Sequence, residues 1–169
     1  MVVIGVDPGN ALCGFGVVRY DGQQWEVVVA GAIRTPAAEA APMRLLSIER
    51  ALSDLIRTHH PEEMAVEKLY FNRNVRTAMR VGEARGVVLL TAARFGLPVA
   101  EYTPPAVKLA VTGNGAADKD QVGLMVQRIL RLRDIPTPDD VADALAIAIC
   151  HCQTATTRRR WEQALSGDQ

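Results

Sequence analysis

The amino-acid sequence predicts an α/β fold: a mixed five-stranded sheet, with three antiparallel strands followed by parallel ones, flanked by helices. Three strand-like segments come first, and the Asp21-Gly22 dipeptide between the second and third is a typical hairpin turn. From Pro42 onward the apolar residues recur at helical spacing, beginning with Leu45, Ile48 and Leu52. Two further short strands then alternate with helical segments, which indicates an α/β arrangement with helices covering the sheet.

Proline and glycine residues mark the boundaries of these elements. His59-His60-Pro61 ends the first helix, Gly96 caps the long second helix, and Pro136-Thr137-Pro138 precedes the last one. We expect strands at residues 2–7, 14–20, 25–33, 64–67 and 99–102, and helices at 42–58, 74–95, 104–111, 118–132 and 139–153. Residues 154–169 lack a clear pattern, so we predict one domain over 1–153 followed by a mobile C-terminal tail.

The composition is that of a folded protein without membrane segments. Hydrophobic residues make up 49% of the chain and charged residues 22%, which argues against disorder. The apolar stretches are far too short to span a bilayer. The three cysteines provide no even disulfide framework, so we expect a reducing, cytoplasmic environment. The net charge of zero neither supports nor excludes nucleic acid as a partner, because it hides how the charges are distributed.

Carboxylates close two of the predicted strands. Asp7 ends the buried first strand, and Glu67 ends the fourth. A carboxylate at the mouth of a buried strand is costly unless it is paired, hydrogen-bonded or bound to a cation. If these two strands are parallel neighbours, both acids lie at the same sheet edge, where α/β proteins usually place their sites.

Three more acids, Asp139, Asp140 and Asp143, begin the last helix. Asp143 can share a helix face with Asp140 or with Asp139, which lie three and four positions before it. Asp139 also suits the role of a helix N-cap, where exposed amides and the helix dipole favour a carboxylate. The apolar run 144–149 predicts that the helix is buried, so we expect its acids to point toward the sheet edge.

Carboxylate oxygens gathered from three elements suit a hard cation, Mg²⁺ or Mn²⁺, rather than zinc. Two such ions could clamp a phosphodiester, one activating water and the other stabilising the leaving oxygen. The sequence therefore predicts a metal site at the end of the first strand.

Several motifs in order closely resemble those of RuvC, the family of bacterial Holliday junction resolvases. They are Asp7-Pro8-Gly9, Gly14-Phe15-Gly16, Ala65-Val66-Glu67 and residues 140–148, with further matching stretches at 80–86, 107–108, 113–119 and 121–126. The resemblance runs from residue 1 to about residue 153. Asp-Pro-Gly alone is a weak motif, but the ordered set at family spacing is highly specific.

The resemblance implies an RNase H-like nuclease domain over 1–153 and a crossover junction endodeoxyribonuclease that acts in DNA recombination and repair. It implies a homodimer that nicks two opposed strands of four-way junction DNA and leaves ligatable 5′-phosphate and 3′-hydroxyl ends. The catalytic metal ligands that it carries over are Asp7, Glu67, Asp140 and Asp143. The implied cofactor is a pair of Mg²⁺ ions, with Mn²⁺ as a substitute, and an implied partner is the RuvA–RuvB branch-migration complex.

Two aromatic residues, Tyr70 and Phe71, follow Glu67 closely, and the family carries an aromatic residue at the junction crossover. Stacking on an unpaired base contributes about 1–3 kcal/mol, and we expect at least one of the two to do so, the alternative being packing beneath the long helix. Arg73 and Arg76 are weaker candidates for phosphate contacts.

Lys108 and Lys119 are two of only three lysines in the chain. Both match family lysines near the active site, where a cation would hold a phosphate. Without the resemblance, each would be interpreted as an ordinary surface lysine.

Gly82 and Gly86 lie four positions apart on the long predicted helix, through which the family dimerises, so we expect a subunit interface there. Cys150-His151-Cys152 could be mistaken for a metal motif, but residues two apart point to different faces of a helix. We interpret them as core residues, with His151 a hydrogen-bonded polar side chain.

Three alternatives compete with this interpretation. A YqgF-type resolvase also begins with a strand ending in Asp-Pro-Gly, but the matched stretch through Lys119 and the last helix argue against it. A sugar-kinase or actin-like ATPase needs a second phosphate loop and a second domain, for which there is no room. A non-catalytic junction-binding dimer would tolerate loss of the acids, and this chain keeps all four.

Overall fold

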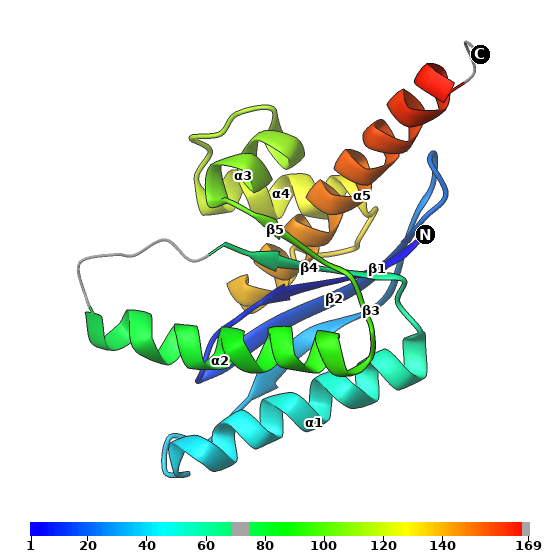
Figure 1. Ribbon diagram of the computed structural model, residues 1–169. Coiled ribbons are helices and arrows are strands. Elements are labelled where there is room, and N and C mark those ends of the chain that lie inside the picture. Colours follow the sequence, from blue (N-terminus) through cyan, green and yellow to red (C-terminus); the bar gives the residue numbers. More distant parts are fainter. Residues whose placement is uncertain (69–74, 167–169) are drawn as a thin grey trace.

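A computed structural model describes residues 1–68 and 75–166 of the chain (Figure 1). Five strands and five helices follow one another along the chain in the predicted order within these ranges. The strands are β1 (Val2–Asp7), β2 (Leu12–Tyr20), β3 (Trp25–Arg34), β4 (Glu63–Glu67) and β5 (Val99–Tyr102). The helices are α1 (Ala41–His59), α2 (Val75–Arg94), α3 (Pro104–Thr112), α4 (Lys119–Ile129) and α5 (Asp139–Ser166).

The strands form one mixed sheet in the order β3-β2-β1-β4-β5. The pairs β1–β2 and β2–β3 are antiparallel, whereas β1–β4 and β4–β5 are parallel. This topology confirms the predicted meander followed by parallel strands. It places β1 at the centre of the sheet, with β2 on one side and β4 on the other.

Helices cover both faces of the sheet and create two hydrophobic cores (Figure 1). Because successive side chains of a strand point to opposite faces, β1 contributes to both cores. Ile4 and Val6 pack with α1 and α2, while Val3 packs with α3, α4 and α5. Helix α5 is buried along the run Val141–Cys152 apart from Asp143, so the predicted burial of this helix is confirmed.

The end of α5 differs from the expectation. The prediction that the last helix ends at Gln153 is wrong, because α5 continues to Ser166. Thr154 and Thr157 remain in the helix with their hydroxyls donating to the carbonyls of Cys150 and Gln153, at 2.8 and 2.9 Å. The predicted division into a nuclease domain over 1–153 and a mobile tail over 154–169 stays a prediction, although residues 154–166 are helical.

Other boundaries move by a few residues. Strand β2 begins at Leu12 rather than Gly14, and α4 ends at Ile129 rather than near residue 132. Gly96 follows α2 with a φ of +64°, a left-handed conformation that suits glycine and agrees with its predicted role as a cap. Within the described ranges, no helix combines the length and the apolar character needed to cross a membrane.

Candidate active site

The two strand-ending acids lie at the same edge of the sheet. Strands β1 and β4 are parallel neighbours in which Val6 is aligned with Val66, so Asp7 and Glu67 both follow directly at the carboxyl ends. The conditional prediction that these strands are adjacent and parallel is confirmed. Antiparallel pairing also aligns Asp7 with Gly14 of β2, on the other side of β1.

Three glycines allow α5 to lie directly on the sheet beside these acids. A Cβ atom on Gly5 would lie 2.1 Å from the backbone oxygen of Ala144, and one on Gly14 would lie 1.9 Å from that of Asp140. A Cβ on Gly16 would lie 2.5 Å from Cδ2 of Leu145. Side chains at these positions would push the helix away, so the glycines determine how closely the first turns of α5 approach β1 and β2.

The Gly14-Phe15-Gly16 motif marks two of these glycines in the sequence, but their contact with α5 was not predicted. Gly14 and Gly16 are two residues apart, so they lie on the same face of β2, and Gly5 is aligned with Gly16 across the β1–β2 pair. Together they form a patch without side chains. Their partner could not be identified before the structure showed α5 above them.

The acids influence one another electrostatically. The pKa of Asp7 is raised to about 7. Burial is the largest cause, and the negative charges of Glu67, Asp143 and Asp140 add to it. Burial and Asp143 likewise raise the pKa of Glu67. Burial raises the pKa of Asp143, although Lys119 opposes the shift. Negative charge from β1, β4 and α5 therefore accumulates at this edge, as the sequence predicted.

Both predicted lysines approach the acids. Lys119 Nζ lies 3.4 Å from Oδ2 of Asp143 and 3.7 Å from Oδ2 of Asp139, and these contacts, mainly Asp143, raise the pKa of the lysine. Lys108 on α3 lowers the pKa of Glu67 by its positive charge. Lys119 stays 68% exposed, so its ammonium remains accessible to a second anion.

Helix α4 holds Lys119 at its first position. The Asp118 side chain accepts a hydrogen bond from the backbone N–H of Gln121 at 2.8 Å, while the Gln121 side chain accepts one from the N–H of Asp118 at 3.2 Å. This reciprocal capping box stops the helix end from fraying, which fixes the start of the lysine side chain.

The acids are gathered but do not form a closed metal-binding shell. Among the described residues, no group of three or more His, Cys, Asp or Glu side chains is close enough to hold a metal ion as it stands. The chemistry of the donors nevertheless fits a divalent cation, because carboxylate oxygens are the preferred ligands of Mg²⁺. A cation would offset both the burial and the repulsion between carboxylates that raise the pKa of Asp7.

Several predicted DNA-binding residues lie outside the described part of the structure. Tyr70, Phe71 and Arg73 belong to residues 69–74, and the side chain of Arg76 at the start of α2 is likewise not described. Their predicted contacts with DNA stay predictions.

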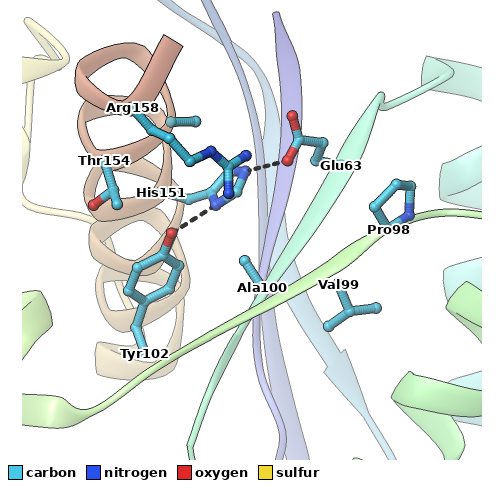
Figure 2. A pocket seen from close by; sticks show the side chains of 9 residues that line it. Glu63, Pro98, Val99, Ala100, Tyr102, His151, Thr154 and Arg158 are labelled. Carbon is cyan, nitrogen blue, oxygen red and sulfur yellow. Dashed lines mark hydrogen bonds and ion pairs between the residues drawn. The ribbon is translucent and has the colours of Figure 1, made fainter. Parts of the chain in front are cut away.

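A separate cavity of about 170 Å³ lies between β5 and α5 (Figure 2). In it the His151 ring is bonded on both nitrogens, with Nδ1 2.8 Å from the Tyr102 hydroxyl and Nε2 3.0 Å from Oε2 of Glu63. Because a carboxylate only accepts, Nε2 carries the hydrogen and the tyrosine hydroxyl donates to Nδ1. Burial lowers the pKa of His151, which favours this neutral form.

This arrangement agrees with the interpretation of His151 as a satisfied polar residue rather than a metal ligand. The neighbouring Cys150 and Cys152 are buried, and burial raises their pKa values to about 11 and about 12. Both thiols are therefore protonated at neutral pH. The cavity belongs to the packing of α5 and not to the acidic edge.

A mixed sheet in this order, with acids ending its two central strands and a C-terminal helix adding more, defines the RNase H-like class of folds. The family model described as crossover junction endodeoxyribonuclease RuvC matches residues 3–151. The chain therefore belongs to the RuvC family, as its motifs predicted.

Similar proteins cover nearly the whole chain. A crossover junction endodeoxyribonuclease RuvC from Moorella thermoacetica is 52% identical over 99% of this chain and 99% of its own. One from Brevibacillus brevis is 53% identical over 90% of this chain and 92% of its own. The solved structure of T. thermophilus RuvC in complex with Holliday junction substrate is 40% identical, with a TM-score of 0.88 over 92% of this chain and 94% of that one.

These matches exclude two of the three alternative families or classes. A RuvC family model and relatives at this identity exclude a sugar-kinase or actin-like ATPase and a YqgF-type resolvase as the family of this chain.

Proposed function

We propose that this protein resolves Holliday junctions by nicking two opposed strands of four-way junction DNA with divalent cations held by Asp7, Glu67, Asp140 and Asp143. One observation carries the proposal: in a chain of the RuvC family, Asp7 and Glu67 end the parallel neighbours β1 and β4 at one sheet edge, and α5 packs against β2 there with Asp140 in its first turn. The T. thermophilus relative bound to Holliday junction substrate supports the choice of DNA.

The bound cations, which we take to be two Mg²⁺ ions with Mn²⁺ as a substitute, would activate a water and stabilise the leaving oxygen of the phosphodiester. The residues of the chain hold and orient this centre. Asp7 lies close enough to the other three acids for each of them to raise its pKa, so it would be the central ligand of a bound cation. Hydrolysis then leaves 5′-phosphate and 3′-hydroxyl ends.

Lys119 and Lys108 would hold the negative charge of the DNA next to the acids. Lys119 contacts Asp143 and Asp139 and keeps most of its side chain exposed, which suits a cation that binds a flanking phosphate. Lys108, on α3, lowers the pKa of Glu67 by its positive charge. Tyr70 and Phe71 would stack on unpaired bases at the junction centre, and Arg73 and Arg76 would contact phosphates.

We further propose that the protein acts as a homodimer through α2, because two nicks in opposed strands require two sites. Met79 and Leu90 are 64% and 59% exposed and, with Gly86, lie at spacings that share one helix face. A Cβ on Gly86 would meet nothing within 4 Å among the described residues, so the packing seen within the chain does not explain this glycine. We also propose that the protein acts in the cytoplasm together with the RuvA–RuvB branch-migration complex.

A nicking assay on four-way junction, linear duplex and flap DNA tests the function. We expect Mg²⁺-dependent, paired nicking of the junction and little cutting of the duplex or flap. Asp7→Asn should abolish nicking while junction binding, measured without divalent ions, stays within about twofold, because the loss affects only the metal site. Equal cutting of all three substrates would indicate a general nuclease instead.

A further inference from the structure

The connection between β1 and β2 begins directly after Asp7 and is held from outside by two polar residues. Its residue Asn10 is only 8% exposed. The Asn10 carbonyl accepts two side-chain hydrogen bonds, one from Oγ1 of Thr35 at 2.5 Å and one from Nη2 of Arg44 at 3.1 Å. Buried carbonyl groups rarely receive two side-chain donors, since most are satisfied by the backbone.

The two donors are also bonded to each other. Arg44 Nε donates to Oγ1 of Thr35 at 2.9 Å, so the threonine hydroxyl both accepts and donates. Thr35 itself is 6% exposed, follows β3 directly, and donates its backbone N–H to the carbonyl of Ala11 at 3.1 Å. The first turns of α1 and the end of β3 thus meet on the same four-residue connection.

The guanidinium of Arg44 has no ionic partner among the side chains that the structure describes. It is absent from the ion pairs found among residues 1–68 and 75–166. Its donors therefore serve the Asn10 carbonyl and the Thr35 hydroxyl, and hydrogen bonds with an ionised donor are about twice as strong as neutral ones.

The connection itself has little freedom to absorb a disturbance. Gly9 is turned so tightly that a Cβ there would lie 2.0 Å from the backbone oxygen of Leu12. Pro8 is buried and fixes its own φ. A shift of Asn10 would therefore be transmitted along Pro8 and Gly9 to the backbone of Asp7 rather than absorbed between them.

We propose that Arg44 and Thr35 are positioning residues for the reaction: through the Asn10 carbonyl they hold the connection that begins at Asp7, and so direct its carboxylate toward the cation. The inference rests on the proposed function, because it takes Asp7 as a metal ligand. Residues that orient a ligand through hydrogen bonds typically change metal affinity or activity by about 10–100-fold when they are replaced.

Four variants test this role. Thr35→Val removes the hydroxyl at similar volume, and Thr35→Ser keeps it. Arg44→Met keeps the length of the side chain and removes its donors. Ile48→Val, also on α1, removes a methylene from the hydrophobic core without removing a hydrogen-bond donor and controls for lost stability.

The measurements are the dissociation constant of Mn²⁺ by calorimetry without DNA, the Mg²⁺ concentration for half-maximal junction nicking, and the melting temperature. We expect Thr35→Val and Arg44→Met to weaken Mn²⁺ binding about tenfold and to raise the half-maximal Mg²⁺ concentration similarly. Thr35→Ser and Ile48→Val should stay within about twofold of wild type in both, even where the melting temperature falls.

The proposal is overturned if Thr35→Val and Arg44→Met lower the melting temperature but leave Mn²⁺ binding and the Mg²⁺ requirement at wild-type values. It is also overturned if Ile48→Val weakens Mn²⁺ binding as much as they do, because the effect would then follow stability. A wild-type protein that neither binds Mn²⁺ nor nicks junctions would refute the proposed function, and this inference with it.

Discussion

Gly14→Ala should show that the rate of nicking depends on the position of the acids and not only on the stability of the fold. The new Cβ would lie 1.9 Å from the backbone oxygen of Asp140, whereas carbon–oxygen contacts in proteins lie at about 3.3–3.6 Å. Backbone cannot rotate away as a flexible side chain can, so the first turn of α5 must move by more than about 1 Å. Asp140 and Asp143 would move with it, away from Asp7 and Glu67.

A misplacement of about 1 Å can cost on the order of 100-fold in rate, and overpacking of a core typically costs about 1–3 kcal/mol in stability. We therefore expect Gly14→Ala to reduce the rate of junction nicking about 100-fold or more at saturating Mg²⁺. The assay is single-turnover nicking of a synthetic four-way junction, at a temperature where circular dichroism shows the variant to be folded.

Gly16→Ala is the matched control. It adds the same methyl group on the same face of β2, but the nearest atom is Cδ2 of the flexible Leu145 side chain, at 2.5 Å. This variant should lose comparable stability and keep nicking within about fivefold, because Leu145 can repack without moving the backbone of α5. Equal rates for Gly14→Ala and wild type, or equal losses in the two variants, would refute the argument that β2 glycines place the acids.

Three further predictions follow from the structure. The raised pKa of Asp7, about 7, means that without metal the folded state loses stability as pH rises from about 4 to about 7, since the unfolded chain releases this proton first. Asp7→Asn should make this loss smaller in thermal melts, with the raised pKa values of Glu67 and Asp143 accounting for the rest, and an unchanged slope would contradict the pKa shift of Asp7. Tyr102→Phe leaves Nδ1 of His151 without its partner and should cost about 1–3 kcal/mol by urea unfolding while nicking stays normal, so a loss of nicking would connect this network to the active site. Leu90→Glu places a charge on the exposed face of α2 and should convert the dimer to a monomer in sedimentation velocity, whereas a persistent dimer would move the interface elsewhere.

The strands and their order could be predicted because each carries a local signal. Period-two apolar residues, the Asp21-Gly22 turn and a carboxylate at the end of a buried strand each depend on a few neighbours in sequence. The parallel pairing of β1 and β4 could be stated only as a condition from the sequence. It depends on the connection through α1 returning the chain to lie beside β1.

The helical continuation of α5 could not be predicted from local propensity. The run Thr154-Ala155-Thr156-Thr157 is rich in β-branched residues, which are poor helix formers. The buried part of α5 already provides the nucleus, so each added residue needs only propagation. Tertiary contacts then support the extension, since Arg159 forms an ion pair at 2.9 Å with Glu63 at the start of β4.

The acids were predictable and their supporting residues were not. Asp7, Glu67 and Asp143 interrupt or end apolar runs, which makes them conspicuous in the sequence. Thr35 and Arg44 are ordinary polar residues in a loop and a first helical turn, and nothing local distinguishes them. Their significance depends on three segments meeting at the Asn10 carbonyl, which only the folded chain shows.

Anomalous scattering from Mn²⁺ in crystals of the wild-type protein tests the central claim most directly. We expect manganese peaks at the carboxyl ends of β1 and β4, within coordinating distance of Asp7 and of at least one acid of α5. The same crystals of Asp7→Asn should lose those peaks. Manganese bound elsewhere, or peaks that persist unchanged in Asp7→Asn, would contradict the account.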